Sequence, residues 1–484
     1  MGDNRQTYKL SDIAKLRNGA AIKQEYFTDA ESGVNLIKVS NFTTNSIDMS
    51  GVTKVDIEHA KKWITHRIKA NDILIATVGS WPPNWSSVVG KVVRAPSETH
   101  GAIQNQNTCC IIPSEQVDQD YLYYLLKTQC FLEWIVNSAQ GSANQARVPV
   151  KNIGDFSIEL PSIDYQAKIS KILNAMDVKI DLNRQINQTL EQMAQTLFKS
   201  WFVDFDPVVD NALDAGFFEQ DLAFSDELLR RVEVRKAVRE SDNFKPLSED
   251  IRRLFPDAFE ECAEPALGLG GWVPKRWVYK AAENIANVSI GKTPPRKESE
   301  WFSEQKESNI TWVSIRDMGE FGTYTGSSRE YLTANAVKKF NIKLVPKGSI
   351  LLSFKLTLGR VAIASEELTT NEAIAHFVEP KHDISASYLY CYLTSFDFNS
   401  LGSTSSIATA VNSKIIKNMP ILVPTKSILN CFKTKVEPLF RKMKLIDDEI
   451  VTLTKLRDTL LPKLISGELS LSDIKIDIPE ETLI

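Results

Sequence analysis

The sequence predicts a mixed α+β protein in which two similar globular domains are separated by two long antiparallel coiled-coil helices, with a pseudo-two-fold internal repeat. Two observations support this fold class. Apolar residues recur every seven positions in two long segments, which is typical of helices that pack against a partner helix. The region before each of these segments carries the same short sequence patterns in the same order, which indicates a duplication.

The first heptad segment, residues 165–201, contains neither Gly nor Pro. Counting in sevens from Ile169 and from Ile172 gives two seam positions, which the polar residues Lys179 and Asn183 interrupt. A helix with so narrow an apolar stripe needs a partner. The predicted interface residues of this helix are Ile169, Ile172, Met176, Ile186, Leu190, Met193, Leu197, Phe198, Trp201 and Phe202. For the last three, closure against the second helix and a docking surface for a partner protein are equally plausible interpretations.

The second heptad segment lies near the C-terminus. Its predicted interface residues are Val436, Leu439, Met443, Ile446, Ile450, Leu453, Leu460 and Leu464. Because each helix follows its own domain, antiparallel pairing would place the two domains at opposite ends of the pair. A helix of about 36 residues is about 50 Å long, and successive major-groove faces on one side of DNA recur about 34–36 Å apart. The helices could therefore act as a ruler.

Six sequence patterns in residues 1–160 recur in order in residues 272–424. For example, NLIKVSNFT is echoed by ITWVSIRDM, and VDQDYLYYLLKTQ by HDISASYLYCYLTS. Chance does not comfortably explain six echoes in one order. The predicted parts are a first domain, a first helix, a connector, a second domain, a second helix and a tail, over residues 1–160, 161–204, 205–271, 272–424, 425–470 and 471–484.

Local patterns place the elements of the first domain. A short helix is expected at 10–16 with Ser11 as its cap, and two amphipathic helices are expected later. Runs rich in Val and Ile predict strands. The expected later helices are 118–128 and 131–138, and the expected strands are 36–39, 73–78, 88–93, 108–112 and 157–160.

The segment 205–270 is acidic, with 16 acidic and 8 basic residues and several prolines. It reads as a connector with one short helix at 224–239. The whole chain has a net charge of −4 and no strongly basic arm. DNA binding would therefore depend on the local placement of charge and on base contacts.

No catalytic or cofactor-binding signature is complete. GLGGWV near Gly268 lacks the third Gly of a dinucleotide fingerprint, and SWPPNW at 80–85 has Trp where a methyltransferase loop carries an acidic or amide residue. The six Cys show no metal-binding spacing and fit a reduced cytoplasmic compartment. No signal peptide or membrane span is expected. We expect no catalytic residue, cofactor or metal.

Polar loops between ordered segments are the candidate DNA-reading surfaces, because Arg, Lys, Asn, Gln, Ser and Thr read base edges. These loops take matched positions in the two repeats but differ in sequence, which suits two different targets. For any single residue, a merely solvated loop is the more common case. The candidates are Trp81, Asn84, Trp85, Gln104, Asn105, Gln106, Ser142, Asn144, Gln145, Arg147, Arg316, Lys355, Thr357, Arg360, Asn371, Ser403, Thr404, Ser405 and Thr409.

Three motifs resemble a known family. LRDTLLPKLISGELSL (456–471) resembles the second conserved region of specificity subunits of type I restriction-modification enzymes. FKSWFVDFDPV (198–208) resembles the end of the first conserved region, and LFPDAFEE…GWVPKRW (254–277) the entry to the second target recognition domain. The Glu-Gln pair that often opens the first helix is absent, since the sequence there is IDYQAKI. This departure concerns boundaries rather than the assignment.

The resemblance implies a non-catalytic, sequence-specific DNA-binding subunit. Each target recognition domain would read one half of a bipartite, asymmetric site in double-stranded DNA, and the helices would set the spacer. Two modification subunits would dock on the helices and methylate adenine, and two ATP-dependent restriction subunits would complete the complex. The alternatives are a coiled-coil scaffold, a methyltransferase-associated DNA-binding protein without a restriction role, and an enzyme in its own right.

Overall fold

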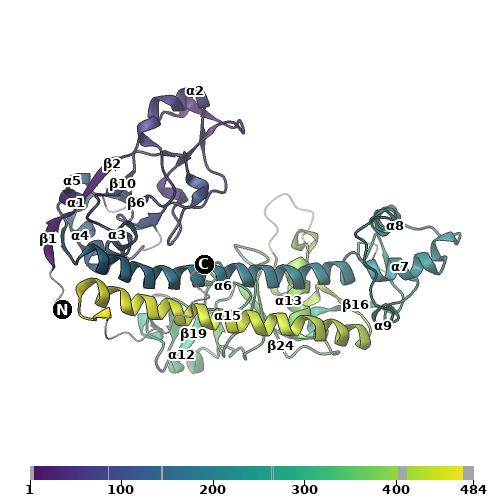
Figure 1. The fold of residues 1–484 in the computed structure, drawn as a ribbon. Coiled ribbons are helices and arrows are strands. Elements are labelled where there is room, and N and C mark those ends of the chain that lie inside the picture. Colours follow the sequence, from purple (N-terminus) through teal and green to yellow (C-terminus); the bar gives the residue numbers. More distant parts are fainter. Residues whose placement is uncertain are drawn as a thin grey trace. The chain divides into compact units, whose positions relative to one another are not determined.

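The computed structural model describes residues 5–84, 87–142, 145–262, 264, 266–401 and 411–471. The chain forms two compact units. Unit 1 comprises Met1–Asp181 and Ile450–Ile484, and unit 2 comprises Leu182–Glu449. The boundary falls inside both long helices, α6 (Ile163–Phe202) and α15 (Lys426–Ser466). Each unit therefore holds one globular domain and a stretch of each helix (Figure 1).

Three sheets organise the globular domain of unit 1. The first is a four-stranded antiparallel sheet in the order β2 (Ala14–Asn18), β10 (Thr108–Pro113), β6 (Ile73–Ala76), β8 (Val92–Arg94). The second has the order β3 (Phe27–Thr28), β5 (Lys54–Val55), β4 (Val34–Ile37), β9 (Ile103–Gln104), and its last pair is parallel. The third pairs β1 (Gln6–Lys9) with β13 (Ser157–Leu160).

Unit 2 repeats these three sheets strand for strand. Its first sheet has the order β17 (Asn287–Ile290), β24 (Ile374–Val378), β21 (Ile350–Ser353), β22 (Val361–Ile363). Its second has the order β18 (Phe302–Ser303), β20 (Glu330–Leu332), β19 (Ile310–Val313), β23 (Thr369–Thr370), again with a parallel last pair. Its third pairs β16 (Val278–Ala281) with β25 (Pro420–Val423). The predicted internal repeat is confirmed by this shared strand order.

Short helices and one further sheet complete the two domains. In unit 1 the helices are α1 (Leu10–Ile13), α2 (Ile57–Ala60), α3 (Gln119–Leu126), α4 (Gln129–Ser138) and α5 (Val150–Gly154). In unit 2 they are α10 (Ala282–Ile285), α11 (Ile315–Met318), α12 (Ala334–Lys339), α13 (Ala386–Ser395) and α14 (Ser413–Asn418). The further sheet, in unit 1, has the order β11 (Gln140–Ser142), β12 (Gln145–Arg147), β7 (Val78–Gly79).

Corresponding helices begin in the same way in the two units. The Asp118 side chain accepts a hydrogen bond from the Tyr121 amide at the start of α3, and Ser385 does so from Tyr388 at the start of α13. These N-caps satisfy amides that lack a partner within the helix. The helix expected at 10–16 is shorter, because the chain turns extended at Ala14 to pair with β10, and Ser11 is not its cap.

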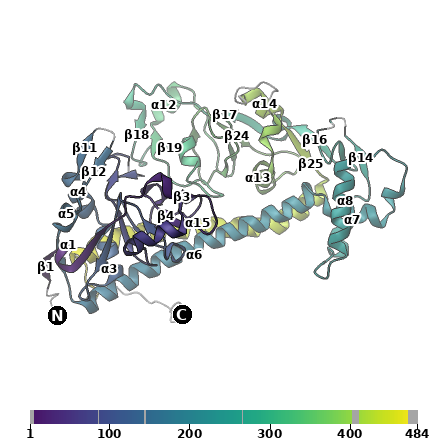
Figure 2. The same cartoon turned by 90° about the horizontal axis from the view of Figure 1, so that it is seen from above.

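The two long helices are antiparallel within each unit, as predicted. In unit 1, Arg457 forms an ion pair with Asp177 at 2.6 Å, and the Leu471 amide donates to the Tyr165 hydroxyl at 3.1 Å. In unit 2, Asn183 donates to Glu449 at 3.0 Å, and Asn187 donates to the Met443 carbonyl at 3.2 Å. Rising numbers in α6 thus meet falling numbers in α15, and Figure 2 shows the two ribbons lying side by side.

One of the two predicted seam positions of α6 is displaced by one residue. Leu173, Ile180 and Ala194 are buried, at 0–1% exposure. The predicted series placed Lys179 and Met193 there instead, and Met193 is 53% exposed, so that assignment is wrong. A heptad permits spacings of three or four residues between its two apolar positions. The observed choice avoids burying the Lys179 ammonium group and buries Ile180 in its place.

The remaining interface predictions fall into two groups. The buried residues are Ile169, Phe198, Trp201, Phe202, Val436, Met443, Ile446 and Leu464. The partly buried residues are Ile172, Met176, Ile186, Leu190, Leu197, Leu439, Ile450, Leu453 and Leu460. The ring of Trp201 packs against Phe255 at 5.0 Å and that of Phe198 against Phe432 at 5.8 Å, so these aromatic residues close the core of unit 2.

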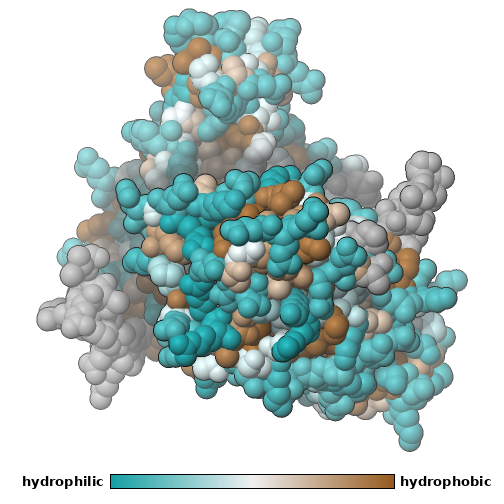
Figure 3. All heavy atoms as spheres, turned by 90° about the vertical axis from the view of Figure 1, so that its right-hand side faces the viewer, coloured by the Kyte–Doolittle hydropathy of each residue, from teal (hydrophilic) through white to brown (hydrophobic). Residues whose placement is uncertain are grey.

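The segment expected as a connector is folded. It contains α7 (Asp206–Asp214), α8 (Asp226–Arg239), α9 (Glu249–Arg252), β14 (Phe259–Glu261) and β15 (Trp272–Pro274). Arg235 binds both carboxylate oxygens of Asp210, at 2.9 and 2.6 Å. Val209 and Val232 are buried between the elements. Three of the acidic residues that suggested a linker, Asp206, Asp210 and Asp214 of α7, pair with arginines spaced four positions apart on α8. The positions of these residues in the sequence do not reveal the pairing. Figures 2 and 3 show this end of unit 2, where hydrophilic side chains surround apolar patches.

None of the helices in the described ranges is long and apolar enough for a membrane crossing. Within the same ranges, no three His, Cys, Asp or Glu side chains gather in a group that could hold a metal ion. The six cysteines are free thiols, and burial raises the pKa values of Cys109, Cys110 and Cys391.

Candidate nucleic-acid interface

A tight turn after β9 positions the first cluster of candidate residues. The Asn105 amide donates to the Ile37 carbonyl at 3.0 Å, and the Asn105 Oδ1 accepts from the Asn107 amide at 3.1 Å. Gly19 lies so close that a Cβ there would be 1.9 Å from the Asn105 carbonyl oxygen. Only glycine permits this approach. The backbone of the turn is therefore fixed from both sides.

The same turn follows β23 in unit 2. The Asn371 amide donates to the Val313 carbonyl at 3.0 Å, and the Asn371 Oδ1 accepts from the Ala373 amide at 3.1 Å. A Cβ at Gly291 would be 2.1 Å from the Asn371 carbonyl oxygen. The two glycine–asparagine turns therefore share these backbone and side-chain hydrogen bonds.

Three predicted base readers are structural residues of these turns. Gln104 is fully buried, and its amide donates to the Arg17 and Thr108 carbonyl oxygens at 3.1 and 3.0 Å. Asn105 is 8% exposed, and the Asn371 side chain accepts a hydrogen bond within its own turn. The prediction that these residues read DNA is not supported, because polar residues beside a strand end also serve to satisfy the backbone. The exposed residues of the turns are Gln106 and Glu372.

A hollow of about 560 Å³ opens beside the turn of unit 2. Three lysines, Lys343, Lys355 and Lys417, line it together with Glu372 and Asn412. Of the three lysines, Lys343 and Lys355 are exposed and Lys417 is half-buried. Ammonium groups gathered around a hollow attract phosphate oxygens. This is a local concentration of positive charge in a chain with a negative total.

Glu372 is ionised in this hollow. Partial burial opposes its ionisation, but the hydrogen bond from the Thr293 hydroxyl and the charges of Lys355 and Arg296 outweigh it and lower the pKa of Glu372. An ionised carboxylate only accepts hydrogen bonds. The hollow therefore combines cations that suit phosphate with one acceptor that suits an amino group.

Arg360 has a structural role that the sequence did not indicate. Its Nη1 donates to the Ile315 carbonyl at 2.9 Å. In unit 1, Lys91 likewise follows a glycine that closes the loop after β6, and its Nζ donates to the Phe42 carbonyl at 3.2 Å. Each cation thus ties the loop that precedes it to a neighbouring segment of its own domain, through the Ile315 carbonyl in unit 2 and the Phe42 carbonyl in unit 1. Arg360 as a guanine reader is not supported by this geometry, whereas Arg316 is exposed.

The loop after β6 in unit 1 joins the β11–β12 hairpin. The Trp81 indole Nε1 donates to the Ser142 carbonyl at 2.8 Å, and Arg147 pairs with Val78 across the sheet. The side chains of Asn84, Gln145 and Arg147 are exposed, so they stay available as candidates. Six further candidates lie outside the described residues: Trp85, Asn144, Ser403, Thr404, Ser405 and Thr409.

The matching loop of unit 2 carries a residue that sequence reasoning missed. Leu356, between the candidates Lys355 and Thr357, is 97% exposed and has a φ of 64°. Both features are unfavourable for a leucine that has no partner, and such strained positions concentrate at functional sites. The signal was a lone apolar residue inside a polar loop, SFKLTLGR, which periodicity arguments ignore.

Polar side chains fasten the domain of unit 1 to its helices. The Tyr124 hydroxyl donates to Asp177 at 2.6 Å, and Arg94 donates to Asn174 at 3.1 Å. Asp177 also pairs with Arg457 of α15. Both helices and the domain meet in this one network, which fixes the orientation of the domain on the helix pair within unit 1.

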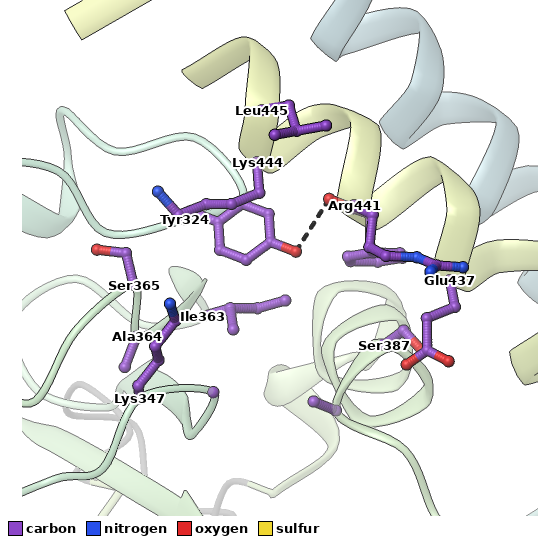
Figure 4. Close-up of a pocket in the computed structure, with 13 residues that line it drawn as sticks. Tyr324, Lys347, Ile363, Ala364, Ser365, Ser387, Glu437, Arg441, Lys444 and Leu445 are labelled. Carbon is purple, nitrogen blue, oxygen red and sulfur yellow. Dashed lines mark hydrogen bonds between the residues drawn. The ribbon is translucent and has the colours of Figure 1, made fainter. Parts of the chain in front are cut away.

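A different arrangement serves unit 2. A hollow of about 420 Å³ lies where the domain meets α15 (Figure 4). Tyr324 crosses it and donates to the Phe440 carbonyl at 3.0 Å. Ile363 and Ala364 line the domain side, and Arg441, Lys444 and Leu445 line the helix side. This site explains how the domain is attached to α15.

The family model described as "Type I restriction modification DNA specificity domain" matches residues 3–192 and 274–436. The chain belongs to this family. The two matched ranges are the two copies of the repeat, each with the start of its long helix. As a type I DNA specificity chain it is a non-catalytic component, because the catalytic activities of these systems belong to partner subunits.

Two curated relatives match most of this specificity chain. The HindI specificity subunit of Haemophilus influenzae is 28% identical, covering 96% of this chain and 99% of its own. The MjaIX specificity subunit of Methanocaldococcus jannaschii is 27% identical, covering 76% and 73%. A crystal structure of the type I restriction-modification S subunit from M. genitalium aligns with a TM-score of 0.49 at 15% identity, covering 96% of both chains.

Proposed function

We propose that each globular domain of this type I specificity chain reads one half of a bipartite, asymmetric site in double-stranded DNA. One observation carries this proposal. The two domains have the same strand order and the same glycine–asparagine turn, but the exposed residues beside that turn differ, as Gln106 and Glu372 do. A shared scaffold with divergent exposed loops suits two readers with different targets.

We further propose that the paired helices set the spacer between the half-sites and dock two modification subunits, with two restriction subunits completing the complex. Apolar side chains on the outer faces of the helices support docking. In unit 1, Val178 and Val451 are 66% and 63% exposed, and in unit 2, Met193 is 53% exposed. A role on chromosomal DNA makes the cytoplasm the proposed compartment.

The modular proposal is tested by exchanging residues 1–160 for those of another family member. The complex is then expressed with its modification subunits, and methylated adenines are mapped in the host genome. We expect one half of the methylated site to change and the other half to stay. A change in both halves, or in neither, would contradict the proposal.

Two alternatives give different results. A chain with a hidden active centre would transfer methyl groups to DNA when purified alone. A coiled-coil scaffold without a DNA role would leave the affinity of the assembled complex for DNA unchanged when Arg147 and Arg316 are both replaced by Ala. Both arginines are exposed, so their side chains can reach DNA.

A further inference from the structure

A glutamine and a glutamate occupy equivalent exposed positions in the two domains. Gln106 directly follows Asn105, and Glu372 directly follows Asn371. We propose that Gln106 and Glu372 are corresponding specificity-determining residues, that Gln106 reads adenine, and that Glu372 accepts a hydrogen bond from the amino group of cytosine. This inference rests on the proposed function of the two domains and assigns the base chemistry of each.

The backbone that carries both residues is held rigidly. In unit 1 the Ala20 amide donates to the Gln104 carbonyl at 2.8 Å, and in unit 2 the Lys292 amide donates to the Thr370 carbonyl at 2.9 Å. Each of these hydrogen bonds ties the start of the turn to the residue that directly follows the glycine. A base reader must be held within a fraction of an ångström to discriminate. These turns meet that requirement better than a free loop does.

The side chains at this position differ in their hydrogen-bonding capacity. A glutamine amide has a donor and an acceptor, which match N7 and the N6 amino group of adenine. A carboxylate has acceptors only, so it suits the N4 amino group of cytosine and is repelled by O6 and N7 of guanine. The Gln106 side chain is already oriented, because its Oε1 accepts a hydrogen bond from the side-chain Nδ2 of Asn105 at 2.6 Å.

The surroundings of Glu372 make a carboxylate tolerable beside DNA. Lys343, Lys355 and Lys417 line the same hollow, so phosphate contacts there can offset the repulsion between the carboxylate and the backbone. The Thr293 hydroxyl donates to Glu372 and fixes its direction. A glutamate that was only a solvent-exposed surface residue would need neither the hydrogen bond from the Thr293 hydroxyl nor the lysine-lined hollow beside it.

The test uses the full complex of this chain with its modification subunits. The variants are Glu372→Gln and Gln106→Glu. Matched controls are Glu367→Gln and Gln116→Glu, which change the same groups at exposed positions outside the two turns. The readouts are the genomic methylation motif and competition binding with DNA duplexes that differ at one base pair. Glu372→Ala serves as a second variant, because removing the side chain should relax the same position without creating a new preference.

We expect Glu372→Gln to act at a single cytosine of one half-site, where discrimination for cytosine falls by about 5- to 150-fold and adenine gains. Gln106→Glu should act at a single adenine of the other half-site, and the controls should leave the motif unchanged. A motif that neither variant alters would overturn the assignment. So would a uniform loss of affinity with the same motif, or two variants that act in one half-site. A wild-type complex without a split methylation site would refute the proposed function itself.

Discussion

Asn187 of α6 donates from Nδ2 to the Asp447 carboxylate of α15 at 2.7 Å and to the Met443 carbonyl at 3.2 Å. One helical turn away, Asn183 donates to Glu449. Polar pairs inside an apolar seam cost stability and fix the register of the helices. Asn183, a polar interruption in the heptad pattern, and Asn187 therefore align the two helices in unit 2.

Replacing Asp447 by Asn should stabilise the protein above neutral pH. Burial raises the pKa of Asp447 to about 6 from 3.8. The folded state then holds the proton more tightly than the unfolded state, so stability falls as pH rises from about 4 through about 6. We expect a gain on the order of 1–2 kcal/mol at pH 8 and much less at pH 4.5. Thermal unfolding at both pH values measures it, with Asp448→Asn as the exposed control; an equal gain at both would contradict the mechanism.

Replacing Arg457 by Met should loosen unit 1. The Arg457 and Asp177 side chains are only 14% and 20% exposed, so the change leaves a poorly solvated carboxylate without its cation. We expect a loss of about 2–4 kcal/mol. Lys444→Met removes the more exposed pair with Asp448 and should cost about 0–1 kcal/mol. Hydrogen exchange of α3 and α6 reports the difference, and similar protection in the two variants would be inconsistent with a buried anchor.

Arg360→Ala and Arg316→Ala should have different consequences. Arg360 ties its loop to the Ile315 carbonyl, so its loss should lower stability by about 1 kcal/mol and leave the methylation motif intact. Arg316 is exposed in the domain of unit 2. If it reads a base, its loss should cost about 1–3 kcal/mol of DNA affinity and relax one position. Thermal unfolding measures the loss of stability, and methylation mapping measures the loss of specificity. A relaxed methylation motif in Arg360→Ala would show that Arg360 reads a base after all.

Leu356 offers a test of apolar contact with DNA, for instance with a thymine methyl group. Because its side chain is 97% exposed, Leu356→Ala should not destabilise the free chain, whereas DNA affinity should fall by on the order of 1 kcal/mol. Leu356→Gly relieves the positive φ and should raise the unfolding temperature while weakening DNA binding to a similar extent. Unchanged affinity in both variants would exclude the contact.

The proposed spacer role predicts the effect of lengthening the helices. Seven residues added to α6 after Asn183 and seven to α15 before Glu449 preserve the heptad and lengthen both by about 10 Å. The spacer should then grow by about three base pairs, since base pairs are about 3.4 Å apart. Methylation mapping reads the spacer directly. A complex that keeps the old spacer would assign the helices to docking alone.

The sequence by itself determined the duplication, the two long helices and the family. Heptads and repeated motifs depend on residue types at fixed spacing, so they can be read along the chain. The strand at 157–160 and the helix from Asp226 to Arg239 follow from equally local signals.

Only the tertiary structure decided which polar residues face outward. Gln104 and Gln106 are two residues apart in one polar run, yet the first satisfies buried carbonyl groups and the second is exposed. The connector also became a folded element only when arginines of α8 met aspartates of α7. Both outcomes depend on groups distant in sequence, and hydrogen-bond satisfaction between such groups has no signature in residue spacing.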